Sequence, residues 1–211
     1  MPIIGERIYS ELDQERIICI TGALSGGKTR LAFDIGLRYW RKGYKINSNV
    51  LHNFTDWMSP HKYGGLFKTY NVVDEGGEYI REAKVGSLIT RSAGKADYYM
   101  VFAGKRLPHK NLQDVIIKPR FDFYQNFGIP LILWRVKVMS DDKYTFPLWQ
   151  YFPSRLHGTY STRSSSAGIE NILSDAQSTV ERLAQIEGQV AGVSRDASIS
   201  GLSEDFESLR S

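Results

Sequence analysis

The chain has 211 residues, 42% of them hydrophobic and 24% charged, which is the composition of an ordinary globular protein with one well-buried domain. No apolar run approaches the roughly 20 residues that span a bilayer, and the first residues contain acidic side chains and no apolar secretory core, so we expect no membrane span and a cytoplasmic location. The single cysteine, Cys19, excludes an internal disulfide bond and a zinc site built from several cysteines.

The charge is distributed unevenly along the chain. The net charge is +4, but residues 169–211 hold eight acidic and three basic residues, which leaves a net charge of +9 on residues 1–168. A basic domain suits a partner rich in phosphate, because neutralising phosphates supplies much of the affinity for nucleic acid. We therefore expect a domain of residues 1–168 followed by an acidic helix and flexible tail at residues 169–211.

The first predicted element is a buried strand at Arg16–Thr21, a run of β-branched residues that ends before a glycine. Directly after it, Gly22–Thr29 has the sequence GALSGGKT and matches the P-loop pattern G-x-x-x-x-G-K-[ST] at every fixed position. Lys28–Lys42 then places apolar residues at helical spacing, and Gly43 follows as a stop signal. The strand, loop and helix that the pattern requires are therefore all predicted.

Each position of this loop has a role in binding a nucleoside triphosphate. Glycines allow the backbone angles that turn successive N–H groups toward phosphate oxygens, and the N-terminus of the following helix attracts the same anion. Lys28 would contact the β- and γ-phosphates, and the Thr29 hydroxyl would bind Mg²⁺. The predicted ATP-binding residues are Gly22, Ala23, Leu24, Ser25, Gly26, Gly27, Lys28, Thr29 and Arg30.

A second nucleotide motif follows the next strands. Tyr44–Val50 is a strand candidate, His52–Thr69 is mostly loop, and Tyr70–Asp74 is a strand that ends in an Asp-Glu pair, as a Walker B motif does. Asp74 would hold Mg²⁺ through water, and Glu75 would act as the general base for the attacking water. This pair favours hydrolysis of the triphosphate over binding alone.

Alternating strands and helices continue after the second motif. The remaining predicted elements are a helix at Glu78–Ser92, a strand at Asp97–Ala103, a short helix or turn at Pro108–Gln113, strands at Asp114–Ile117 and Pro130–Met139, and an amphipathic helix of about five turns at Ile169–Ile186. Cys19, Trp40, Trp134 and Trp149 lie in apolar settings and are predicted core residues. The expected fold class is α/β, a three-layer P-loop NTPase sandwich with a mainly parallel sheet and a C-terminal helical tail.

With these motifs in place, the chain resembles the additional-strand group of P-loop ATPases, which includes FtsK/HerA-type DNA pumps, viral and phage DNA-packaging ATPases and zonula occludens toxin-like proteins. The resemblance covers about residues 15–165. Beyond the P-loop, similar segments are Lys42–Val50 with the toxin-like proteins, Val72–Ile80 with packaging ATPases, and Leu88–Ala103 and Leu156–Ser164 with the pumps. The pumps usually end the fourth strand in a polar sensor, often Gln, and here that role falls to Lys105, Arg106 or Asn111.

The resemblance implies an ATP- and Mg²⁺-dependent motor that translocates or packages double-stranded DNA as a homo-oligomeric ring, in a host cytoplasm or a virion. In such rings one subunit supplies an arginine to its neighbour's transition state. Arg91 is the first candidate for this catalytic arginine, followed by Arg106 and Arg120. The basic stretch from Lys105 to Arg120, together with Phe121 and Phe123, would contact the DNA backbone.

Two other functions remain open on these residues. One is a phage morphogenesis or assembly NTPase of the zonula occludens toxin type, with the C-terminal helix contacting a capsid or assembly partner. The other is a small-molecule kinase of the nucleotide-kinase type, which would need an arginine-rich lid and an acceptor pocket. Glu75 directly after Asp74 suits hydrolysis better than transfer to a second substrate.

Overall fold

The computed structural model describes residues 3–4, 7–23, 26–52, 56–57, 66–78, 80, 83–139, 145–151, 160–164, 173–182 and 184–185. The elements in chain order are β1 (Ile3–Ile4), α1 (Arg7–Gln14), β2 (Ile17–Thr21), α2 (Lys28–Arg41), β3 (Lys45–Ser48), β4 (Val50–His52), β5 (Asp56–Trp57), β6 (Thr69–Asp74), η1 (Gly76–Glu78), α3 (Ala83–Lys95), β7 (Tyr99–Gly104), η2 (Lys110–Leu112), β8 (Val115–Asp122), α4 (Phe123–Phe127), β9 (Leu131–Val138), β10 (Thr145–Tyr151) and β11 (Tyr160–Ser164). Residues 173–182 form a further helix.

In the described part of the chain, the main sheet has nine strands in the order β1-β10-β9-β8-β2-β7-β6-β3-β5, and β11 pairs with β4 separately. The strands from β8 to β5 in this order run parallel to their neighbours. β8–β9, β9–β10 and β10–β1 are antiparallel. The expected α/β class is therefore confirmed, with a mixed sheet.

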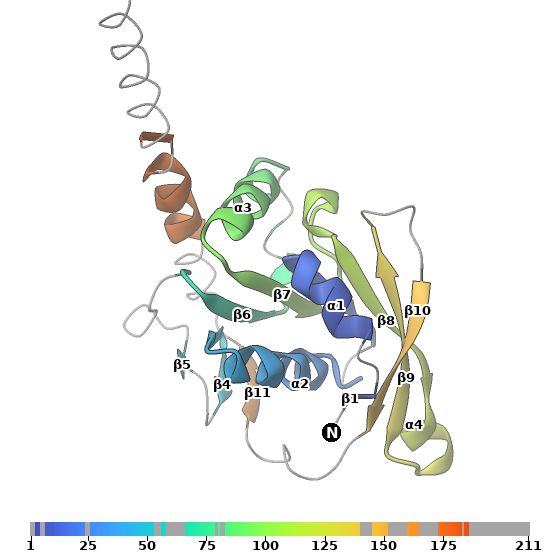
Figure 1. Cartoon of the computed structure of the whole chain (residues 1–211). Coiled ribbons are helices and arrows are strands. Elements are labelled where there is room, and N and C mark those ends of the chain that lie inside the picture. The colour runs from blue at the N-terminus through green and yellow to red at the C-terminus, as the bar shows by residue number, and fades with distance from the viewer. Residues whose placement is uncertain are drawn as a thin grey trace, which may run out of the picture.

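The antiparallel half of the sheet follows from a short connection. α4 and the few residues after it join β8 to β9 (Figure 1). A connection this short returns the chain beside the strand it has left, whereas parallel neighbours need a longer crossover, such as the one through α3 that joins β6 to β7. The sheet is therefore parallel from β5 to β8, and β8, β9 and β10 form an antiparallel meander.

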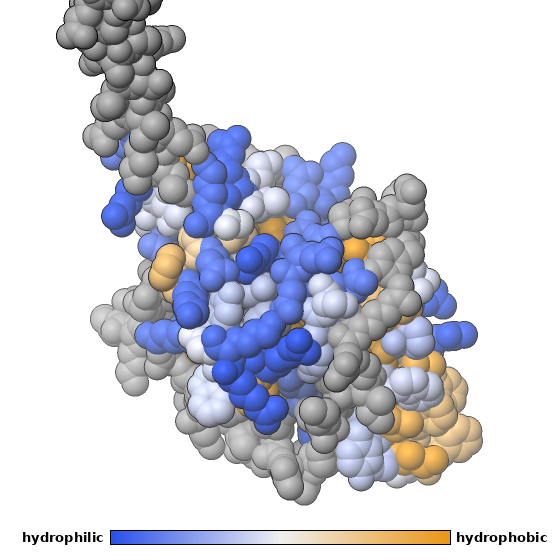
Figure 2. All heavy atoms as spheres, in the orientation of Figure 1, coloured by the Kyte–Doolittle hydropathy of each residue, from blue (hydrophilic) through white to orange (hydrophobic). Residues whose placement is uncertain are grey.

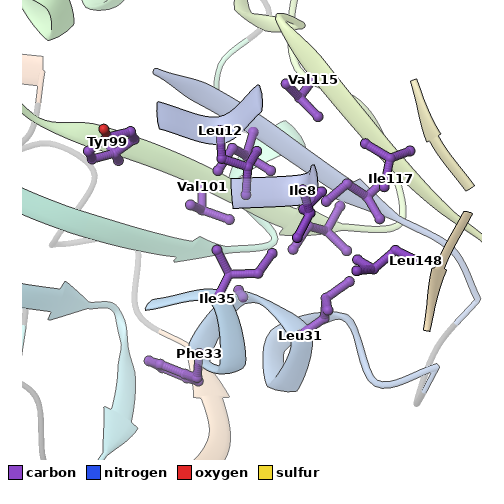
Figure 3. Close-up of a cluster of buried hydrophobic side chains, with 14 of the residues drawn as sticks. Ile8, Leu12, Leu31, Phe33, Ile35, Tyr99, Val101, Val115, Ile117 and Leu148 are labelled. Carbon is purple, nitrogen blue, oxygen red and sulfur yellow. The ribbon is translucent and has the colours of Figure 1, made fainter. Parts of the chain in front are cut away.

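The two faces of the parallel strands carry separate cores. Along β2, Ile18 and Ile20 join a cluster with residues of α1 and α2, part of which Figure 3 shows. Ile17 and Cys19 join a second cluster with residues of α3 and the 173–182 helix. Alternate residues of a strand point to opposite faces, so helices cover both sides of this strand, with α2 and α3 on opposite sides of β6 and β7 (Figure 1).

The 173–182 helix is part of the second core. Ala176 is fully buried there, and the backbone N–H of Leu66 donates a 2.8 Å hydrogen bond to Asp175 Oδ2. This helix falls inside the amphipathic helix expected at Ile169–Ile186, whose other residues largely lie outside the described ones. The boundary proposed at residue 168 stays a prediction. No helix among the described residues is long and apolar enough to cross a membrane.

Several sequence expectations differ from the structure. Helix α1 was not predicted, because only Ile8 and Leu12 of its eight residues are apolar and buried. Trp134 and Cys19 are buried as expected, but Trp40 is wrong as a core residue: it lies in the last turn of α2 and is 54% exposed. β8 runs past Ile117 through Pro119, where a register shift in its pairing with β9 accommodates the proline.

Candidate functional site

The candidate residues lie where three parallel strands end. The register pairs Thr21 of β2 with Gly104 of β7, and Asp74 of β6 with Ala103 of β7. The segments that leave these three strands therefore start from the same edge of the sheet. In open α/β sheets, this carboxyl-terminal edge is where ligands bind.

The glycine-rich loop leaves this edge and turns into α2 at Gly27. Gly27 has φ +76°, a left-handed conformation that suits glycine, and as the N-cap residue it offers no side chain to the first turn of α2. Lys28 is buried, and its Nζ donates a 2.8 Å hydrogen bond to Ala23 O. The ammonium group therefore folds back over the loop. Leu24 and Ser25 of the predicted set lie outside the described residues.

Thr29 and Asp74 are 45 residues apart in sequence and in direct contact in the fold. The Thr29 hydroxyl donates a 2.9 Å hydrogen bond to Asp74 Oδ1. Burial raises the pKa of the Asp74 carboxyl, while the Thr29 hydrogen bond and the charge of Lys28 act in the opposite direction. Two hard oxygen groups are thus held together beside a buried cation.

No family model and no curated protein matches this chain.

Glu75 occupies a strained turn directly after β6. Its φ is +56°, in the left-handed region that residues with a side chain seldom adopt, and its N–H donates to Ala103 O at 2.6 Å. Its carboxylate Oε2 lies 3.4 Å from the backbone N of Lys105. The turn thus holds the carboxylate between the ends of β6 and β7.

The two glycines after Glu75 allow a close approach of the loop that follows β7. A Cβ added at Gly77 would lie 2.0 Å from Arg106 O, and one at Gly76 would lie 2.6 Å from Val73 Cγ1. Neither distance is possible for a real side chain, so both positions need glycine. The two glycines of the Asp-Glu-Gly-Gly sequence are therefore required by the side chains and backbone packed around them.

Asn49 is a site residue that the sequence analysis did not single out. Its side chain accepts a 2.7 Å hydrogen bond from Asp74 N and donates one of 3.0 Å to Asp74 O. It is buried directly after β3, the neighbour of β6. This amide fixes the backbone that carries the Asp74 carboxylate. The only available signal was an asparagine at the end of a predicted strand.

The side chain of Arg30, predicted to bind the nucleotide, lies in the interior. It is buried, with Nε 3.9 Å from Asp34 Oδ2. Gln150 of β10 donates a hydrogen bond to the same oxygen and accepts one from Trp134 of β9 at 3.0 Å. Burial raises the pKa of Asp34 to about 6. This network ties α2 to the antiparallel strands, so at Arg30 we expect phosphate contact from the backbone N–H.

The three candidate arginines lie in different places. Arg106 is exposed in the loop that packs on Gly77. Arg120 follows Pro119, and Pro119 packs closely on Gly22 of the glycine-rich loop, since a Cβ added at Gly22 would lie 2.9 Å from Pro119 Cγ. Both are therefore near the carboxyl edge. Arg91 is exposed late in α3, which ends beside the start of β6, where Lys68 N donates to Ala96 O at 3.3 Å. The structure does not bring Arg91 together with the other site residues of its own chain.

The candidate sensor residues Lys105 and Asn111 also lie in different places. Lys105 lies at the end of β7, where its backbone contacts Glu75 Oε2 and its carbonyl accepts a 3.0 Å hydrogen bond from the Thr21 hydroxyl. Asn111 lies in η2 and donates a 3.2 Å hydrogen bond to Ser87 of α3. Lys105 is thus the candidate in contact with a predicted catalytic residue.

Proposed function

We propose that this chain is a P-loop ATPase that binds ATP with Mg²⁺ and hydrolyses it at the carboxyl edge of a three-layer sandwich. The hydrogen bond between Thr29 and Asp74 carries the proposal. A hydroxyl and a carboxylate in contact are the hard oxygen donors that suit Mg²⁺, which would neutralise charge on the phosphates. Lys28 and the N-terminus of α2 supply positive charge beside them.

In the proposed reaction Glu75 accepts a proton from the attacking water. Its carboxylate oxygen faces the N–H of Lys105, which orients it without neutralising it. Asp74 contributes differently, through its contact with Thr29. The two neighbouring acids thus have separate environments and separate proposed roles, one for the water and one for the metal.

Replacing Asp74 with asparagine is expected to weaken Mg²⁺-dependent ATP binding about 10- to 100-fold, because the amide keeps the contact with Thr29 but lacks the charge that attracts the cation. The dissociation constant of a fluorescent ATP analogue, measured with MgCl₂ and with EDTA, checks this. The difference between the two conditions should shrink in Asp74→Asn. An unchanged difference would remove Asp74 from the metal site.

The proposed biological role is a motor on double-stranded DNA. Residues 1–168 carry a net charge of +9, and Lys105 and Arg106 are exposed at the same edge as the site. ATPase rates measured with and without linear duplex DNA test this role, and DNA is expected to raise the rate. An ATPase rate that does not change when DNA is added would favour an assembly NTPase. Phosphate transfer to nucleoside monophosphates would indicate a kinase.

The proposed oligomer uses an arginine in trans. Arg91 is exposed and lies away from the site of its own chain, as a residue that serves a neighbour must. Mixing Arg91→Ala with Lys28→Ala subunits should restore activity that neither has alone, because some interfaces pair an intact loop with an intact arginine. The arginine effect is expected to be about 10³-fold or more. Co-assembly without any recovery would exclude Arg91, and Arg106 and Arg120 would be tested next.

A further inference from the structure

On one face of the antiparallel strands, the short helix α4 packs against one end, and no other helix of the described chain contributes to a core there. Along β9, Ile132, Trp134 and Val136 point into the first core, so the alternate residues point to the opposite face. The residues of the second core come from β2, β6, β7 and helical segments, and none described there comes from β9 or β10. We call this surface of β8, β9 and β10 the open face.

One end of the open face is aromatic. The register sets Phe121 opposite Leu133, and Leu133 opposite Trp149. Phe123 joins Phe121 to Trp149, with ring centroids 4.6 Å and 5.9 Å away, and Phe127 lies 6.0 Å from Phe121. Figure 2 shows hydrophobic side chains gathered where Figure 1 places α4. These rings form a continuous group that is still in contact with solvent, since Phe121 is 38% and Phe127 66% exposed.

The next row of the open face is basic. Lys118 of β8 and Arg135 of β9 are register partners, and both are exposed. Lys137 lies two residues further along β9 on the same face. Within the described part of the chain, no carboxylate lies within ion-pair distance of these three side chains. Like charges directly opposite each other destabilise a strand pair, and a bound anion would relieve that repulsion.

We propose that the open face binds single-stranded nucleic acid. Unpaired bases would stack on the aromatic row, and their phosphates would lie over the basic row two residues along the strands, about 7 Å away. A duplex buries the faces of its bases and could use only the cations. Rings and cations share one sheet surface here, so the bases and phosphates of one strand would contact both rows. The inference is independent of ATP hydrolysis.

Fluorescence anisotropy of a labelled oligothymidine of about 20 nucleotides, with the full chain and no nucleotide, tests the proposal. The single strand is expected to bind at least about 10-fold more tightly than a duplex of the same length. Phe127→Ala should weaken single-strand binding about 5- to 100-fold, the range for losing one stacked base. Lys118→Gln should lower the slope of log affinity against log salt by about 0.7, the value for one phosphate contact on a single strand.

The matched controls lie on α2, on the other side of the sheet. Trp40→Ala removes an exposed aromatic ring and Arg41→Gln removes an exposed charge, and neither should change affinity or salt slope. Phe127 and Lys118 are exposed, so both variants should keep the parent melting temperature, which is measured alongside. Equal affinity for duplex and single strand would overturn the proposal. Unchanged binding in both variants would also overturn it. A third contrary outcome is that the same substitutions leave nucleic-acid binding intact and abolish either binding to phosphatidylserine vesicles or self-association.

Discussion

Lys28→Ala is expected to remove detectable ATPase activity, a loss of at least about 100-fold, together with most of the affinity for ATP. The Lys28 ammonium folds over the loop to Ala23 O, and no other lysine comes from this loop. Its charge is the one that the proposed site places against the β- and γ-phosphates. Steady-state phosphate release and equilibrium binding of a fluorescent ATP analogue measure the two losses.

Lys42→Ala is the matched control, because this lysine ends the same helix and pairs with Asp13 at 2.8 Å, away from the loop. It should keep both activity and affinity. The melting temperature of Lys28→Ala should stay near that of the parent, which would separate loss of the site from loss of the fold. Hydrolysis at the parent rate by Lys28→Ala would refute the site altogether.

Glu75→Gln is expected to bind ATP and Mg²⁺ like the parent and to hydrolyse ATP at least about 100-fold more slowly, as expected when a general base is lost. Glutamine keeps an oxygen that can face the N–H of Lys105, so the geometry of the turn should persist. Single-turnover hydrolysis and analogue binding, run in parallel, separate the chemical step from affinity.

Two further variants complete this test. Glu181→Gln, on the exposed part of the 173–182 helix, is the control for a neutralised acid and should match the parent rate. Asp74→Asn should lose Mg²⁺-dependent binding where Glu75→Gln retains it. Equal losses of binding in Asp74→Asn and Glu75→Gln would contradict the separate roles proposed for the two acids.

The parallel half of the fold was predictable because its signals are local. Arg16–Thr21 is a continuous apolar run, and the observed strand is Ile17–Thr21; Lys28–Lys42 has helical spacing, and the observed helix is Lys28–Arg41. The meeting of Thr29 with Asp74 follows from a general property of parallel strands, whose carboxyl ends share one edge.

Contacts that depend on strand order were not predictable. Asn49 reaches Asp74 only because β3 lies beside β6, and Pro119 reaches Gly22 only because β8 lies beside β2. Neither neighbour relation is encoded in a local pattern. The continuation of β8 through a proline also runs against ordinary strand preferences, and it depends on a register shift that appears only once β9 is in place.

The left-handed backbone angle at Glu75 lowers the stability of the folded chain. A residue with a side chain costs roughly 1–2 kcal/mol in the left-handed region, and glycine there costs far less. The next two residues, Gly76 and Gly77, are glycines because no side chain would fit there. Glu75, which has the strained backbone angle, is not a glycine and carries a carboxylate. Selection for folding stability alone would favour glycine at position 75. The role proposed for the Glu75 carboxylate would account for this loss of stability.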